Sequence, residues 1–130
     1  MKSYDRLQIS FKPNIDTYNS ISKILGVHPT ELIDKKAVPS VWIYEVIEEQ
    51  DDEFYDFIKK FLDLLESNYK KLADLDIKRE DITIWYLYEY DQQCNMEFSP
   101  SRLKRLGDNE ITLCISCWDS GQELKPTIND

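Results

Sequence analysis

The chain has 130 residues, of which 42% are hydrophobic, and its 25 acidic and 16 basic residues give a formal net charge of −9. This length and apolar content predict one folded domain over residues 1–130, with a core at about 5–118 and a polar tail at 119–130. The negative charge repels phosphate backbones and anionic lipid surfaces, which argues against nucleic-acid and membrane partners. An odd number of cysteines, three, and the lack of a long apolar run favour a cytoplasmic location.

In the first half of the chain, apolar and polar residues alternate over residues 7–11, which predicts a strand with one buried face. Apolar residues at helical spacing then predict a helix over residues 16–25, ended by Gly26. A loop is expected over residues 28–39, and the β-branched and aromatic run at 40–47 predicts a second strand.

In the second half, residues 52–72 predict the longest helix, because apolar residues recur there at intervals of three and four. Residues 82–90 alternate most clearly and predict a central strand. A short strand around 95–98, a helix over 100–106 and a last strand ending at Trp118 follow. The order of elements predicts an α+β fold, with a single mixed or antiparallel sheet of about five strands covered by helices.

The two ends of the chain resemble each other. A phenylalanine and a proline precede a short helix that leads to a leucine and a glycine in both regions, at Pro13 to Gly26 and at Pro100 to Gly107. Proline suits a first helical turn, and glycine accepts the left-handed conformation that ends a helix. The similarity predicts an internal strand-helix-strand pseudo-repeat.

No group of residues indicates catalysis or metal binding. Cys114 and Cys117 have the spacing of redox and zinc motifs, but they lie in a predicted strand, where residues three apart point to opposite faces. His28 is the only histidine, and it has no acid, serine or cysteine beside it. We therefore expect no enzyme activity, no catalytic residues, no metal site and no cofactor.

Short motifs in both halves resemble the bacterial domain-of-unknown-function family 4279. In the second half the resemblance rests on the residues from Met96 to Pro100, Leu103 and the Leu106–Gly107 pair. In the first half it rests on Ile21, the segment from Leu25 to Thr30, and Trp42. The resemblance implies a small bacterial cytoplasmic domain, and it supplies no catalytic residues.

Two candidate sites follow from the residues. The densest acidic run contains Glu48, Glu49, Asp51, Asp52 and Glu53, and it could steer a basic protein toward this chain. The structural alternative is that these carboxylates stabilise the start of the following helix. The second candidate site is a pocket between sheet and helices, lined by His28, Trp42, Tyr44, Tyr86 and Tyr88.

The leading functional hypothesis is an acidic protein-binding module that binds a basic partner and acts as an immunity or neutralising protein for a basic toxin. The alternative is a small-molecule binding or regulatory domain with an aromatic pocket. A concave, aromatic-lined pocket favours this alternative, whereas a flat acidic face does not. An enzyme and a protein that mimics DNA with its carboxylates are the remaining hypotheses. An aromatic sheet face left uncovered by helices is a further surface suited to a partner.

Overall fold

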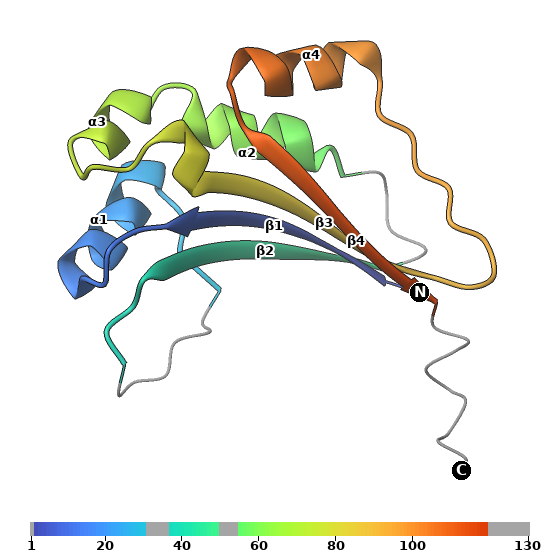
Figure 1. Cartoon of the computed structure of the whole chain (residues 1–130), viewed down its shortest axis with the longest axis horizontal. Coiled ribbons are helices and arrows are strands. Elements are labelled where there is room, and N and C mark those ends of the chain that lie inside the picture. Colours follow the sequence, from blue (N-terminus) through green and yellow to red (C-terminus); the bar gives the residue numbers. More distant parts are fainter. Residues whose placement is uncertain (1, 31–36, 50–54, 120–130) are drawn as a thin grey trace.

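The computed structural model describes residues 2–30, 37–49 and 55–119, which form one sheet with helices on one of its faces (Figure 1). The strands are β1 (Lys2–Ser10), β2 (Val41–Glu49), β3 (Ile82–Tyr90) and β4 (Thr112–Asp119). The helices are α1 (Ile15–Leu25), α2 (Phe57–Leu65), α3 (Tyr69–Ala73) and α4 (Pro100–Asp108), and a single 3-10 turn spans Arg79–Asp81. This confirms an α+β fold.

The sheet is mixed, and its strand order is β2-β1-β3-β4. β1 runs antiparallel to both β2 and β3, while β3 and β4 are parallel. The described residues form four strands in one sheet, so the predicted strand around 95–98 is wrong. That segment rises from the end of β3 toward α4 on the helix side of the sheet (Figure 1), and it pairs with none of the described strands.

A pseudo-repeat is not confirmed, because the two strand-helix-strand units are built differently. β1 and β2 are antiparallel neighbours, whereas β3 and β4 are parallel neighbours. Gly26 ends α1 with a left-handed φ of 74°, as predicted. Gly107 lies inside α4, which continues to Asp108.

The predicted long helix over 52–72 is two helices. Its first three positions lie outside the described residues, and Asp56 is the N-cap of α2, its side chain accepting a hydrogen bond from Lys59 N at 3.2 Å. The interruption follows Leu65, where Asn68 Nδ2 donates to the Leu64 carbonyl oxygen at 2.7 Å. A side-chain amide that binds the carbonyl four residues earlier competes with the helical backbone hydrogen bond, so the helix pattern breaks here.

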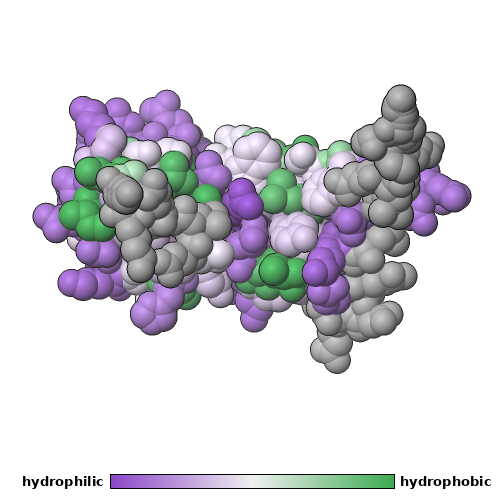
Figure 2. Space-filling view, turned by 90° about the horizontal axis from the view of Figure 1, so that it is seen from below, coloured by the Kyte–Doolittle hydropathy of each residue, from purple (hydrophilic) through white to green (hydrophobic). Residues whose placement is uncertain are grey.

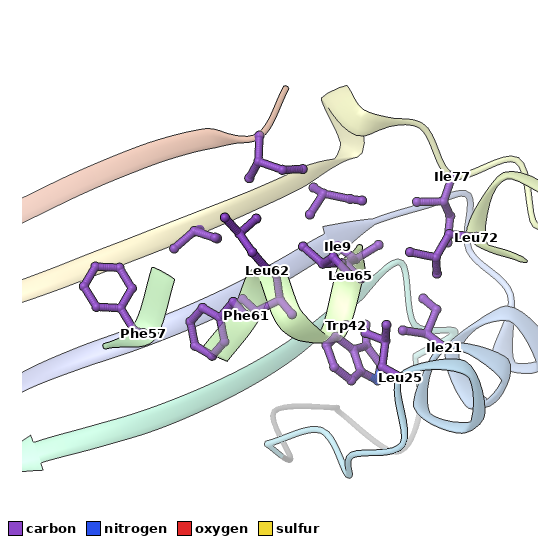
Figure 3. Packing of buried hydrophobic residues seen from close by; sticks show 14 of the residues in the cluster. Ile9, Ile21, Leu25, Trp42, Phe57, Phe61, Leu62, Leu65, Leu72 and Ile77 are labelled. Carbon is purple, nitrogen blue, oxygen red and sulfur yellow. The ribbon is translucent and has the colours of Figure 1, made fainter. Parts of the chain in front are cut away.

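The hydrophobic core lies between the helices and the half of the sheet nearest α1 (Figure 3). β1 contributes Leu7 and Ile9, both completely buried, from one face of the strand. The largest completely buried side chains are Trp42 of β2 and Phe61 of α2. Trp42 Nε1 donates to Ser22 Oγ of α1 at 3.0 Å, so the indole is satisfied inside the core.

The strand assignment of the two cysteines near the C-terminus is confirmed. Cys114 pairs in register with Trp85, and Cys117 pairs with Tyr88. Trp85 and Tyr88 are three residues apart on β3, so the two thiols point to opposite faces of the sheet. All three cysteines are free thiols, and the Cys114–Cys117 spacing does not form a site.

Candidate functional site

The candidate site lies at the end of the sheet farther from α1, where β1 begins and where β2 and β3 end. Along β1 the side chains of odd-numbered residues point toward the helices, and Leu7 and Ile9 fill the core. Ser3 and Asp5 continue the same phase of the strand beyond the core. Two polar side chains therefore face the helix layer at this end.

Asp5 is completely buried, and neither of its carboxylate oxygens accepts a hydrogen bond from the described residues. Burial, together with a hydrogen bond and charge repulsion from the neighbouring Glu48 carboxyl, raises its pKa to about 9, although the positive charge of Arg102 acts in the opposite direction. A hydrogen bond between two carboxyl groups requires one of them to be protonated. The raised pKa assigns that proton to Asp5 at neutral pH.

Glu48 is the acceptor in this pair. It lies directly across from Ser3 in the β1–β2 register, and its Oε2 accepts a hydrogen bond from Ser3 Oγ at 3.4 Å. The Ser3 hydroxyl thus contacts the Glu48 carboxylate, and Asp5 lies two residues further along the same face of β1. The arrangement presents a fixed negative group on the helix side of the sheet.

Glu48 lines a pocket of about 180 Å³. Its wall combines four aromatic rings, two carboxylates, one methionine and one arginine, namely Glu48, Tyr55, Phe57, Tyr86, Met96, Glu97, Phe98 and Arg102. They come from β2, β3, α2, α4 and the segments beside these helices. The pocket therefore forms only when the whole fold is assembled.

The aromatic wall is closely packed. The rings of Phe57 and Tyr86 stack in parallel with centroids 5.2 Å apart, and Phe98 meets them edge-on at 6.3 and 6.1 Å. Burial raises the pKa of Tyr55 and of Tyr86 to about 12, so both hydroxyls are neutral at pH 7. Ring faces of this kind attract cations through their quadrupole.

Arg102 forms one side of the pocket and is balanced by a local partner. Its Nε donates to Asp56 Oδ1 at 3.0 Å, and its guanidinium carbon lies 5.7 and 5.5 Å from the ring centroids of Phe57 and Phe98. Asp56 compensates the arginine charge. The carboxylates of Glu48 and Glu97 therefore leave the pocket with a negative balance.

The structure separates the residues of the predicted aromatic pocket. Tyr86 lines the observed pocket, and the ring of Tyr88 lies 5.6 Å from that of Tyr86. Trp42 belongs to the core, and Tyr44 packs against the rings of Trp42 and Phe61 at 6.5 and 6.1 Å. His28 is exposed and does not line the pocket. Grouping His28 and Trp42 with Tyr86 in one site was therefore wrong.

The acidic run is also divided. Glu48 faces the pocket, whereas Glu49 points to the other face of the sheet and pairs with Lys2 Nζ at 3.5 Å. Both residues are in β2, so they do not stabilise the start of a helix, and Asp56 caps α2 instead. Asp51, Asp52 and Glu53 lie outside the described residues.

Asp5 and Arg102 were missed in the sequence. The alternation predicted for residues 7–11 continues backward through Asp5, and this would have placed a carboxyl on the buried face. No comparable signal exists for Arg102, because its contact with Asp56 joins residues 46 positions apart.

The second face of the sheet carries none of the described helices (Figure 2). Its apolar side chains include Ile47, Trp85 and Tyr4, whose ring stacks on that of Trp118 at 6.4 Å. An ion pair between Arg6 and Glu45, 2.7 Å apart, interrupts them. Figure 2 shows hydrophilic groups between the apolar ones over the part of this face that the described residues leave in view.

No family model, curated protein or solved structure matches this chain. The resemblance to family 4279 therefore stays a prediction. Among the described helices, none has the length and apolar character needed to cross a membrane. Within residues 2–30, 37–49 and 55–119, no three histidine, cysteine, aspartate or glutamate side chains are placed to hold a metal ion.

Proposed function

We propose that this protein is a non-enzymatic binding domain whose pocket receives a small basic group, an alkylammonium or a guanidinium. The observation that carries the proposal is the Glu48 carboxylate in the wall of an aromatic-lined pocket, with the buried Asp5 carboxyl beside it. A carboxylate that is fixed before the ligand arrives loses little freedom on binding. Ring faces beside it add cation–π attraction.

The size of the pocket supports a small group as the occupant. Its volume of about 180 Å³ is below the roughly 300–1,000 Å³ of pockets for drug-sized ligands. Since a water molecule takes about 30 Å³ of the liquid, the space suits a group of a few heavy atoms. A lysine or arginine side-chain end and a free small amine both meet this requirement.

The overall charge supports a basic rather than an acidic ligand. The chain carries a formal net charge of −9, and the pocket itself retains Glu48 and Glu97 once Asp56 compensates Arg102. Opposite charge speeds association and disfavours acidic competitors. A basic protein, such as a toxin neutralised by an immunity protein, and a small amine share this chemistry.

Titration calorimetry with n-butylammonium chloride and with methylguanidinium chloride tests the proposal. The wild-type protein is expected to bind these probes saturably and to ignore sodium butyrate, which has the opposite charge. Glu48→Gln is expected to weaken binding about tenfold or more, because a hydrogen bond to a charged group contributes about 1.5–3 kcal/mol. Glu80→Gln, an exposed position in the 3-10 turn outside the pocket, is the matched control and should bind as the wild type does.

An equal response to butyrate, or unchanged binding by Glu48→Gln, would contradict the proposal. A lysine-containing peptide that binds far more tightly than n-butylammonium would assign the basic group to a protein partner. Similar affinity for the peptide and the free amine would assign it to a small molecule.

A further inference from the structure

We infer that Asp5 is a positioning residue for Glu48, and that entry of a basic group into the pocket releases the proton these two carboxyl groups hold between them. The inference rests on the proposed function and describes how the same site is regulated. It predicts that the pocket exchanges a proton for a cation.

The strand register places the two carboxyl groups together. Ser3 is opposite Glu48 in the β1–β2 pairing, and Asp5 is two residues further along the same face of β1. Diagonal neighbours on one face of an antiparallel pair are within reach of a long side chain such as glutamate. Asp5 is completely buried and has no hydrogen-bond donor among the described residues, so its ionised form is disfavoured until a further cation comes close.

The surrounding groups leave Asp5 as the source of the proton. The groups that act on this pair are Tyr55 beside α2, Tyr86 of β3 and Arg102 of α4, together with Ser3 and Glu48 on the strands themselves. Burial raises the pKa of Tyr55 and of Tyr86 to about 12, which keeps both neutral. An arginine side chain stays protonated throughout.

The exchange balances without a further reactant. Before binding, the pair holds one proton and one negative charge in total. When a guanidinium enters, the O–H bond of Asp5 breaks, its proton passes to a buffer base, and two carboxylates face one cation. A nearby positive charge favours the ionised form of a carboxyl group, so the ligand lowers the pKa of Asp5 from its free value of about 9.

Calorimetry in two buffers at pH 7.5 measures the released proton directly. Methylguanidinium chloride is the probe because its own charge does not change between pH 7 and pH 9. Phosphate and Tris have different heats of ionisation. The number of protons released per ligand is the difference between the binding heats observed in the two buffers, divided by the difference between the two heats of ionisation. The wild-type protein should release between about half a proton and one proton per bound ligand, and its affinity should rise up to about tenfold per pH unit from pH 7 toward pH 9.

Two variants separate this mechanism from a structural role. Asp5→Asn keeps a hydrogen-bond donor for Glu48 but has no carboxyl proton to release, so its binding should release none. Glu97→Gln removes a pocket carboxylate without touching the pair and should still release the proton, although it binds more weakly. Wild-type binding without proton release, or equal release by Asp5→Asn, would overturn the inference and leave the proposed function standing. Absence of binding by the wild-type protein would overturn both.

Discussion

Asp5→Asn is expected to have a nearly constant stability between pH 5 and pH 9, whereas the wild-type protein is expected to lose stability steadily over the same range. The folded protein holds a proton on Asp5 up to a pKa of about 9, while the unfolded chain releases it near the ordinary value of 3.8. The folded state thus binds one proton more than the unfolded state between these values. A raised folded pKa gives stability that is present at low pH and lost as pH rises.

The slope of this loss is at most about 1.4 kcal/mol per pH unit for one proton. Asp63 and Glu66 act in the opposite sense, because hydrogen bonds from Arg105 lower the pKa of each to about 2. The stability that these two carboxylates contribute is present above their pKa values in the unfolded chain and is lost only in acid. It therefore does not change between pH 5 and pH 9.

Urea unfolding at each pH unit measures the effect. The free energy of unfolding of the wild-type protein should fall toward pH 9, and Asp5→Asn should be the more stable protein at pH 8. Asp74→Asn, at an exposed position, is the matched control and should keep the wild-type slope. A wild-type profile as flat as that of Asp5→Asn would show that Asp5 is ionised in the folded protein.

The second large effect is expected for Phe61→Ala. Phe61 is completely buried in α2, and its ring lies 6.1 Å from that of Tyr44 and 6.3 Å from that of Phe57 (Figure 3). Removing such a ring loses its transfer free energy and leaves a cavity, which costs about 3–5 kcal/mol. Domains of this kind have about 5–15 kcal/mol of total stability, so much of it would be lost.

The midpoint of urea unfolding at pH 6 tests this prediction against a matched control. Leu103→Ala removes an apolar side chain that is 48% exposed on α4, and a change within about 0.5 kcal/mol is expected there. Equal effects of the two substitutions would contradict the assignment of Phe61 to the core.

Local patterns in the sequence predicted the helix end and the strand that are determined by residues close together in the chain. The left-handed conformation at Gly26 and the alternation over Ile82–Tyr90 both follow from residues close in the chain. The break after α2 was missed because a strong apolar pattern hides the hydrogen bond of a single residue, Asn68. Strand order and the number of strands depend on contacts between distant segments, and periodicity says nothing about them.

The candidate site was predicted only in part for the same reason. Tyr86 and Glu48 were both named, but in two separate hypotheses, because they are far apart in the sequence and meet only when β2 and β3 are placed on either side of β1. Asp5 lay before the part of the strand that was predicted. Its burial breaks the rule that a carboxyl group avoids an apolar layer, and such exceptions are concentrated at functional sites.

The most direct test of this account is the titration of the Asp5 carboxyl carbon by NMR in protein labelled with carbon-13, with its signal assigned from Asp5→Asn. This carbon is expected to titrate with an apparent pKa near 9, and methylguanidinium is expected to move the transition to lower pH. A transition near the ordinary value of 3.8 would contradict it, since Asp5 would then be ionised at neutral pH and could release no proton to a ligand.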